Sequence, residues 1–367
     1  MLVAAALSFA LAATLSLPVH AAECITPSVR REWRQFSKDE KADWISAVNC
    51  LSKLPHNPNL TPTVPPEISL IPGINASGSY YDDFVYIHMD LNTRIHNTAF
   101  FYPFHRWYVA VYETALVEKC GYAGASPYWN WSIDARDFIA SDFLKDSDPV
   151  SGLGGWGDPA KDYQVQDGGF SSLSVSYPSQ HIVRRNFTEY PYAAIDELFG
   201  GTGGGLFPDP DTPANSTFTI EKVAAAVNGY TGDFAHFQQW MERGEGPHAA
   251  VHFILGGDLA GGCPANAPAN CTPGPTWSAD EPLFWMHHAM VDKVWYDWQH
   301  ANESNFWAFE GGATQSFTNV TFYNEWPAGA PPMLTLDSVM PADGMFAEAT
   351  VRDMMNTTGG ALCYVYE

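Results

Sequence analysis

Two histidines at helical spacing give the first indication of chemistry in this sequence. The stretch "GEGPHAAVHFILGGD" places His248 and His252 four residues apart, with Pro247 at the start of the expected helix and a Gly-Gly pair at its end. Side chains at positions i and i+4 lie on one face of a helix, about one turn apart. Two imidazoles arranged in this way can hold one metal ion.

A second stretch, "EPLFWMHHAMVDKVW", places the adjacent pair His287 and His288 in an aromatic and aliphatic run. A buried imidazole without a partner costs roughly 1–3 kcal/mol, so each ring must hydrogen-bond or bind a metal. Metal sites of this kind use three protein ligands and leave one position open. We therefore expect this helix to supply the third ligand to His248 and His252. The alternative is that each ring is a hydrogen-bonded core residue.

Three further histidines lie in the segment "DDFVYIHMDLNTRIHNTAFFYPFHRWYVAVYETAL". His88, His96 and His105 are eight and nine residues apart. Neither spacing keeps one helical face, so we expect the rings to come from a helix, a loop and the next helix. Pro103 supports a break in the chain just before His105. The alternative is that all three histidines are satisfied core residues among aromatic side chains.

The donor set of both groups indicates which metal they hold. Each group offers neutral imidazoles, with no carboxylate or cysteine among the candidates. Magnesium and calcium prefer oxygen ligands, and paired zinc ions are generally balanced by a bridging carboxylate. Copper cycles between two oxidation states without requiring anionic ligands. The sequence therefore predicts two copper ions, a pair that can pass two electrons to O2.

Helices must position these side chains. Apolar residues recur at helical spacing in residues 28–55, 80–91, 105–118, 220–227, 233–243, 247–255 and 282–300. Residues 55–72 and 142–213 are rich in Pro, Gly, Ser or Asp and are expected to be long loops, and residues 361–366 to be a short strand. Because no repeat and no linker is visible, we expect one mainly α domain over residues 22–367 with minor β structure.

The first residues, "MLVAAALSFALAATLSLPVHAAEC", are an apolar run followed by small residues. Val19 and Ala21 fit the small-x-small rule, which predicts a signal peptide at residues 1–21 with cleavage after Ala21. The run lacks Lys and Arg, so the free α-amine supplies its positive charge. The alternative is a buried N-terminal helix. No later apolar run approaches the roughly 18 residues that span a bilayer. We therefore expect a secreted protein.

The cysteines agree with an exported protein. Six cysteines without a C-x-x-C pair predict three disulfides. The favoured pairs are Cys263–Cys271, which closes a Pro/Gly loop, Cys50–Cys120, which joins two helices, and Cys24–Cys363, which ties the termini together. N-glycosylation is predicted at the sequons of Asn75, Asn186, Asn215, Asn319 and Asn356.

Charge limits the partners of this protein. The chain of 367 residues has 41 acidic residues against 18 Lys and Arg, a net charge of −23. Such a surface disfavours nucleic acid and anionic membranes as partners. The 46% of hydrophobic residues can bury a large core. We also expect a small-molecule substrate and a monomeric state.

Two long motifs resemble those of a known family. "HNTAFFYPFHRWYVAVYE" resembles the first copper motif of tyrosinases and catechol oxidases, and "EPLFWMHHAMVDKVW" resembles the second. With "SPYWNW" and "PHAAVH", the resemblance spans roughly residues 24–330 and is similar to the short, secreted fungal branch of these type-3 copper proteins. It implies a four-helix bundle around a dinuclear metal centre, with long loops outside. The implied activity uses O2 to oxidise o-diphenols, and weakly monophenols, to o-quinones.

The resemblance also implies roles for individual residues. Copper A would be bound by His88, His96 and His105, and copper B by His248, His252 and His288. In the family motif the ligand is the second histidine of the pair, four residues before Asp292, so His287 would point away from the metal and would support the ligands or line the substrate pocket. Asp292 would orient the ligands by hydrogen bonding.

Other residues match the remaining parts of the motifs. Phe284 matches a ring that packs across the metal site, while Arg106 and Glu113 match the structural part of the first motif. Glu242, or else Glu245, could hold the water that deprotonates a phenol.

Four positions depart from the family pattern. Glu281 replaces the usual Asp before Pro282, Asn130 stands where Asp is common, and Arg94 occupies the position of a thioether-forming Cys. Ala249 follows the first copper-B histidine, where many efficient monophenol hydroxylases have Asn. This last departure predicts that diphenols react better than monophenols.

Two other functions remain open on the same motifs. One is a non-oxidative enzyme of fungal secondary metabolism, of the cyclopenase type and zinc-dependent. The other is an O2 carrier, which a small secreted monomer with an unblocked site disfavours. Metal analysis with O2 consumption on catechol separates the oxidase from the non-oxidative enzyme.

Overall fold

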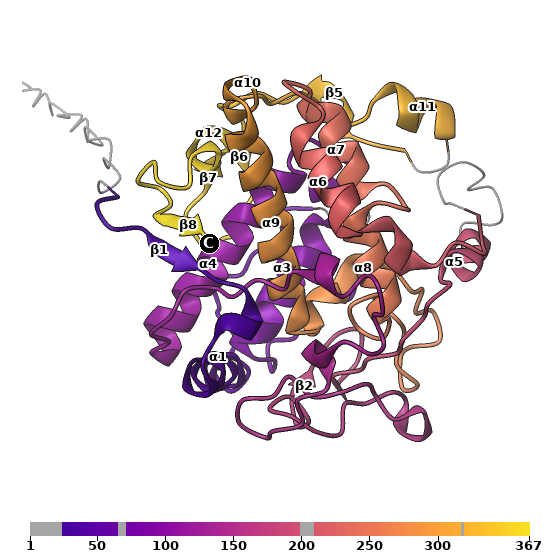
Figure 1. The fold of residues 1–367 in the computed structure, drawn as a ribbon. Helices are drawn as coiled ribbons and strands as arrows, with labels where there is room; N and C mark the ends of the chain where they lie inside the picture. The colour runs from indigo at the N-terminus through magenta and orange to yellow at the C-terminus, as the bar shows by residue number, and fades with distance from the viewer. Residues whose placement is uncertain (1–23, 65–70, 199–208, 317–318) are drawn as a thin grey trace, which may run out of the picture.

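A computed structural model describes residues 24–64, 71–198, 209–316 and 319–367. The predicted signal peptide lies outside this part of the chain. Four helices form the centre of the molecule: α3 (Tyr80–Ile95), α4 (Phe101–Cys120), α8 (Pro247–Leu255) and α9 (Leu283–Ala301) (Figure 1). The mainly α fold expected from the sequence is confirmed.

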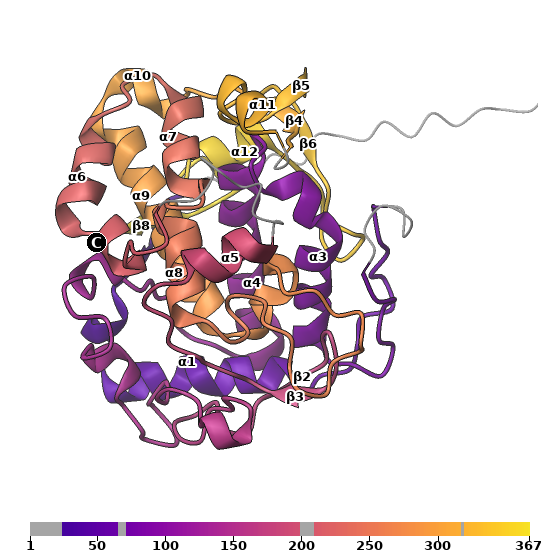
Figure 2. The ribbon, with the colours of Figure 1, turned by 90° about the vertical axis from the view of Figure 1, so that its right-hand side faces the viewer.

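Shorter elements surround these four helices (Figures 1 and 2). The other α-helices are α1 (Lys38–Leu51), α5 (Tyr192–Leu198), α6 (Ile220–Asn228), α7 (Phe234–Glu242), α10 (Glu303–Phe306), α11 (Val320–Glu325) and α12 (Val351–Met355). The 3-10 helices are η1 (Trp33–Gln35), η2 (Trp131–Ile133), η3 (Asp142–Leu144), η4 (Pro159–Lys161), η5 (Ala214–Thr217) and η6 (Pro275–Asp280). The strands pair two by two: β1 (Ser28–Arg30) with β8 (Tyr364–Tyr366), β2 (Ser174–Val175) with β3 (His181–Ile182), β4 (Gly312–Thr314) with β5 (Ala330–Met333), and β6 (Val339–Met340) with β7 (Ala349–Thr350).

Local sequence explains where the long helices begin. The Ser79 hydroxyl accepts a hydrogen bond from the Asp82 N–H while the Asp82 carboxylate accepts from the Ser79 N–H, a capping box that starts α3. Helix α4 begins at Phe101, so Pro103 lies inside its first turn rather than at a break before His105. A proline is tolerated there because the first-turn N–H groups have no partner within the helix. The break falls instead between Ile95 and Phe101.

The segment expected to be one helix at residues 28–55 is divided. Its first residues form β1 and η1, and only Lys38–Leu51 forms α1, which Ser37 and Glu40 start with a capping box. Strand β1 pairs in parallel with β8 from the far end of the described chain. Figure 1 shows these two strands side by side next to α4 and α9.

All three predicted disulfides are confirmed. The described residues contain Cys24–Cys363, Cys50–Cys120 and Cys263–Cys271, with no free cysteine among them. Cys50–Cys120 joins the ends of α1 and α4, and Cys24–Cys363 lies beside the β1–β8 pair.

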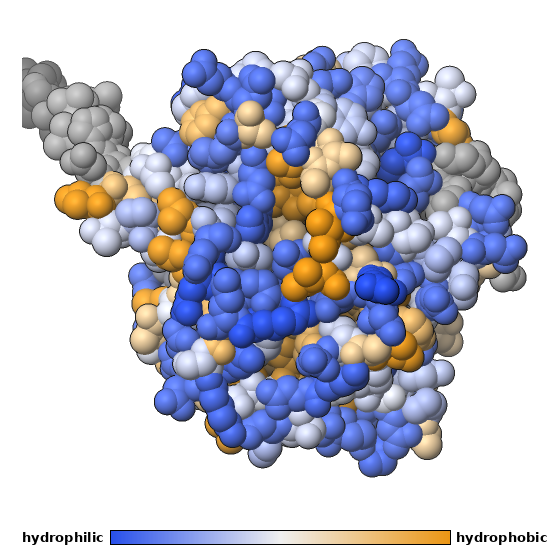
Figure 3. Space-filling model, viewed as in Figure 1, coloured by the Kyte–Doolittle hydropathy of each residue, from blue (hydrophilic) through white to orange (hydrophobic). Residues whose placement is uncertain are grey.

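The core is aromatic and lies between the central helices. Tyr112 of α4 stacks on Trp285 of α9 with ring centroids 3.6 Å apart, a contact that fixes one helix against the other. None of the helices in the described ranges has the length and apolar character required to cross a membrane. The face drawn in Figure 3 is mostly hydrophilic, with hydrophobic residues gathered near its middle over α6 and α9.

Candidate metal centre

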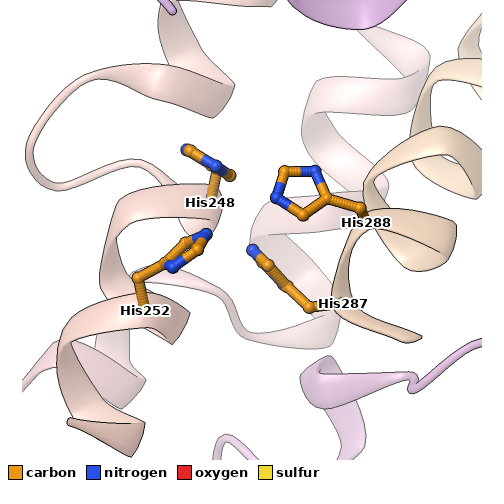
Figure 4. Close-up of side chains that lie close together, drawn as sticks. All are labelled: His248, His252, His287 and His288. Carbon is orange, nitrogen blue, oxygen red and sulfur yellow. The ribbon is translucent and has the colours of Figure 1, made fainter. Parts of the chain in front are cut away.

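Helices α8 and α9 bring four histidines together. His248 and His252 project from one face of α8, and His287 and His288 project toward them from α9 (Figure 4). One ring nitrogen from each lies within 4.8 Å of those of the others. The pairing of α8 with α9 was expected, but the group has four rings rather than three, because His287 also faces it.

The other three histidines form a second group with the expected origins. His88 comes from α3, His96 from the residue directly after α3, and His105 from α4. One ring nitrogen of each lies within 4.8 Å of the others. Eight- and nine-residue spacings therefore do converge on one point, because the chain turns between the two helices.

The two groups lie next to each other. The rings of His105 and His288 stack with centroids 4.2 Å apart, and those of His96 and His248 are 5.7 Å apart. Phe284 packs against both groups, with its ring centroid 5.0 Å from His88 and 4.2 Å from His288. This places an apolar wall beside the histidines, as the motif implied for Phe284.

Main-chain carbonyls fix the orientation of four rings. The Nδ1–H groups of His88, His96, His105 and His252 donate to the carbonyls of Thr276, Asn92, Phe101 and Leu259, at 3.0, 3.0, 2.8 and 2.6 Å. A carbonyl can only accept, so Nδ1 carries the proton and Nε2 keeps its lone pair. This is the tautomer in which a histidine binds a metal through Nε2.

The remaining nitrogens show that the groups fit metal ions. The buried Nε2 atoms of His88, His105, His248, His252 and His288 have no hydrogen-bond partner. Unpaired buried polar atoms are rare, because each costs roughly 1–3 kcal/mol. Their convergence in two adjacent groups fits a pair of metal ions held by imidazoles.

Burial also keeps the imidazoles neutral. Loss of hydration lowers the pKa of His96 and of His252 to about 4 and lowers the pKa of the other five histidines of the two groups well below the ordinary value. At neutral pH all seven rings therefore have a free lone pair for a metal.

The hydrogen bonds of Asp292 go to arginines and tyrosines rather than to the histidines. Its carboxylate accepts hydrogen bonds from Arg106 of α4 at 2.5 Å, from Arg30 of β1 at 3.3 Å, and from the hydroxyls of Tyr364 and Tyr366 of β8 at 2.5 and 2.6 Å. The expected hydrogen bond to the ligand set is therefore wrong. Asp292 instead joins α9 to α4 and to both ends of the described chain.

Arg106 and Glu113 extend this network, as the motif implied for them. Arg106 also donates to the side chain of Gln299 at 2.9 Å and to the Met354 carbonyl at 2.8 Å. The Glu113 carboxylate accepts from Arg30 at 2.9 Å. These contacts fix α4 and α9, which carry three of the seven histidines, against each other.

Glu242 and Glu245 have different environments. Glu242, at the end of α7, is 5% exposed, and its carboxylate accepts from the Asn97 N–H at 2.7 Å and the Gln238 amide at 2.8 Å. Burial raises its pKa well above the ordinary value. Glu245 is partly exposed and pairs with Arg243 at 3.1 Å. Of these two glutamates, only Glu242 is buried. It contacts Asn97, the residue that follows His96 of the first group.

Sequence reasoning missed the residues that act through their backbone. Thr276 of η6 and Leu259 of the turn after α8 orient His88 and His252, and the Gly/Pro-rich sequence around them carries no side-chain signal for this role. Asn92 and Phe101 were detectable, because each precedes its histidine by four residues, the distance of a helical carbonyl.

Comparison with known proteins places the chain in one family. Residues 78–301 match the family model described as the common central domain of tyrosinase. The chain is 29% identical over 358 residues to "Tyrosinase-like protein phomQ1" of Diaporthe leptostromiformis, covering 94% of this chain and 79% of that protein. It is 27% identical over 383 residues to "Tyrosinase P" of Aspergillus terreus, covering 94% of each.

Two further comparisons agree with these. The "N-acetyl-6-hydroxytryptophan oxidase ivoB" of Emericella nidulans is 29% identical over 371 residues, covering 93% of this chain and 92% of that protein. A polyphenol oxidase variant from Thermothelomyces thermophila has the same fold, with a TM-score of 0.62 at 24% identity over 93% of this chain and 89% of that one. The chain belongs to the tyrosinase family of oxidoreductases.

Proposed function

We propose that this protein is a secreted dicopper polyphenol oxidase that uses O2 to convert o-diphenols, and weakly monophenols, to o-quinones. The observation that carries the proposal is the convergence of unpaired Nε2 atoms in two adjacent histidine groups beside Phe284. Copper A would be held by His88, His96 and His105, and copper B by His248, His252 and His288.

The balance of the reaction follows from its substrates. Each diphenol gives up two electrons and two protons, so two diphenols are oxidised for each O2 reduced to two waters. When bound, the copper pair would supply the path for these electrons. The protein itself orients the imidazoles through main-chain carbonyls and excludes water with Phe284, whose side chain is fully buried.

Glu242 is the proposed proton acceptor. Its raised pKa makes it a stronger base than an exposed carboxylate once ionised, and the donors Asn97 N–H and Gln238 hold its orientation. Ala249, directly after His248, offers a methyl group where an amide could help to hold a water. Diphenols, which are more acidic than monophenols, suffer less from this missing partner.

The proposal includes location and organisation. We propose that residues 1–21 are a signal peptide and that residues 22–367 are a single domain, secreted and monomeric. The three disulfides support an oxidising compartment. The pairing of β1 with β8 supports one domain, because strands near both ends of the described chain belong to the same two-stranded sheet.

One observation favours the alternative of a non-oxidative, zinc-dependent enzyme. With His287, the second group has four imidazoles whose nitrogens lie within 4.8 Å of one another, and four nitrogen ligands suit tetrahedral zinc. Metal analysis of the purified protein and O2 consumption on 4-methylcatechol decide between the two. Two copper ions per chain with rapid O2 uptake support the oxidase, whereas zinc without O2 uptake supports the alternative.

A further inference from the structure

His252 depends on a carbonyl that lies outside its own helix. Its Nδ1–H donates to the Leu259 carbonyl at 2.6 Å, seven residues further along the chain. The carbonyls that orient His105 and His96, by contrast, belong to residues of helices. Phe101 of α4 and Asn92 of α3 each lie four residues before the histidine they orient. The orientation of His252 is therefore only as rigid as the turn at residues 256–262 that carries Leu259.

That turn is pressed against the segment after β3. Gly256 has φ of +62°, and a Cβ placed there would lie 1.9 Å from the carbonyl oxygen of Asn186. Gly257 has φ of +53°, and its Cβ would lie 2.1 Å from the carbonyl oxygen of Arg184. Only glycine permits so close an approach in this conformation. Figure 2 shows the loop after α8 lying beside β2 and β3.

Asp258 connects the turn to this segment. Its side chain is fully buried, and its Oδ2 accepts from the Arg184 N–H at 2.7 Å, while its own N–H donates to the Arg184 carbonyl at 3.0 Å. The Arg184 guanidinium donates to Asp258 Oδ1 at 3.3 Å and to the Gly262 carbonyl at 3.0 Å. Arg184 thus holds the turn at Asp258, near its start, and at Gly262, at its end.

His181 supplies a second positive charge to Asp258. Its Nδ1–H donates to the Ser179 carbonyl at 2.6 Å, and its Nε2 lies 3.0 Å from Asp258 Oδ1. Because the carbonyl requires a proton on Nδ1 and the carboxylate favours one on Nε2, the ring is placed as an imidazolium. The other charged group that acts on His181 is Arg184, and the buried Asp280 of η6 interacts electrostatically with Asp258.

We propose that Asp258 and His181 are positioning residues for copper B, which hold the turn at residues 256–262 so that the Leu259 carbonyl fixes His252 with Nε2 toward the metal. This inference rests on the proposed role of His252 as a copper ligand. Residues that orient a ligand in this way typically contribute 10- to 100-fold to metal affinity.

The test compares copper retention in three variants. Asp258→Asn keeps the shape of the side chain but loses its charge, and His181→Gln removes the imidazolium with less risk to folding. His56→Gln is the matched control: it removes another buried contact between a histidine and an aspartate, His56 Nδ1 to Asp83 Oδ1 at 2.5 Å, that holds a loop against α3.

Competition with a chelator, followed by metal analysis, measures each copper separately. We expect the affinity for one of the two copper ions to fall about 10- to 100-fold in Asp258→Asn, with a change in the same direction in His181→Gln and none in His56→Gln. Unchanged affinity for both ions in Asp258→Asn and His181→Gln would overturn the inference. The inference would also be overturned if these variants lost both copper ions equally and unfolded at a lower temperature, because the effect would then be a general loss of stability.

A measurement on the metal-free protein separates this inference from the proposed function. Nitrogen NMR of the His252 ring reports its tautomer, and we expect Nδ1–H in the wild type and a mixture of tautomers in Asp258→Asn. If the wild type binds no copper, the proposed function fails, yet the shift in tautomer still supports the role of Asp258. A pure Nδ1–H tautomer in both proteins rejects that role.

The pH dependence supplies an independent check. Burial lowers the pKa of His181, but the contact with Asp258 outweighs it and raises the pKa above its ordinary value. Above that pKa the neutral Nε2 presents a lone pair to the carboxylate, so the turn is held less firmly as the pH rises. We expect the dissociation rate of one copper relative to the other to rise with pH in the wild type and to stay constant in His181→Gln. A constant ratio in the wild type would contradict the role of His181.

Discussion

His105 of α4 and His288 of α9 stack on each other with ring centroids 4.2 Å apart and planes inclined by 13°. One ring belongs to each histidine group, so the distance between the groups is set by how closely α4 and α9 pack. Tyr112 and Trp285, which stack between the same two helices, therefore help to fix the separation of the two histidine groups.

The first prediction concerns the metal ligands. His96→Ala and His252→Ala should each abolish oxidase activity, because each removes one of three nitrogens from a copper, while the fold is retained. His287→Ala should keep both copper ions. Metal analysis and circular dichroism check these outcomes. If His287→Ala loses copper B and His288→Ala retains it, the choice within the pair is wrong.

The second prediction concerns substrate preference. An unperturbed phenol has a pKa near 10, so at neutral pH only about one molecule in a thousand is ionised. With Ala249 in place of an amide, oxidation of 4-methylcatechol should be much faster than hydroxylation of tyrosol. Ala249→Asn should raise the ratio of monophenol to diphenol rates. Steady-state rates on both substrates decide this, and a wild-type ratio near one would refute it.

The third prediction concerns the pH dependence of stability. Burial, with a further contribution from Asp90, raises the pKa of Asp343 to about 7. The unfolded value is about 3.9, so the folded state binds more protons between these values, and stability falls as the pH rises through this range. Asp343→Asn should remove this loss, which is on the order of a few kcal/mol.

Urea unfolding at pH 5 and pH 8 measures the difference. The midpoint of the wild type should fall more between these two values than that of Asp343→Asn. Asp337→Asn, at an exposed residue paired with Arg352, serves as the control and should behave like the wild type. Parallel curves for wild type and Asp343→Asn would show that Asp343 ionises normally.

The fourth prediction tests whether Asp292 is structural. Asp292→Ala leaves the buried Arg30 and Arg106 without their shared carboxylate, which should cost about 3–5 kcal/mol of unfolding free energy. Asp297→Ala on the same helix removes only a half-exposed pair with Lys293 and should cost about 0.3–0.5 kcal/mol. Denaturant unfolding of both variants gives the comparison. Equal values would mean that the network around Asp292 adds no stability.

The sequence predicted the histidine groups because local spacing determines which face of a helix a side chain occupies. His248 and His252 needed only the i, i+4 rule, and His88, His96 and His105 needed only the inference of a turn between two helices. The resemblance supplied the pairing of the groups. The position of Pro103 was misread, because a proline can end a helix or lie in its first turn, and the residues around it do not distinguish these cases.

Long-range contacts could not be predicted. Asp292 lies four residues after His288, which predicts the helix face but not the partners: Arg30 is 262 residues away. Glu281 likewise pairs with Arg185, 96 residues before it, with both side chains fully buried. Such ion pairs depend on how distant segments pack together in the fold, and the local sequence of each segment does not indicate its partner.

The pairing of β1 with β8 has a consequence for the order of events during synthesis. All seven histidines of the two groups have left the ribosome once residue 288 has, but the partners of Arg30 in β8 follow only at residues 364–366. Until then Arg30, which pairs with Glu113, lacks its hydrogen bond to the Tyr366 hydroxyl. We therefore expect a nascent chain arrested near residue 330 to be far more sensitive to protease than the finished protein, although it contains every proposed copper ligand.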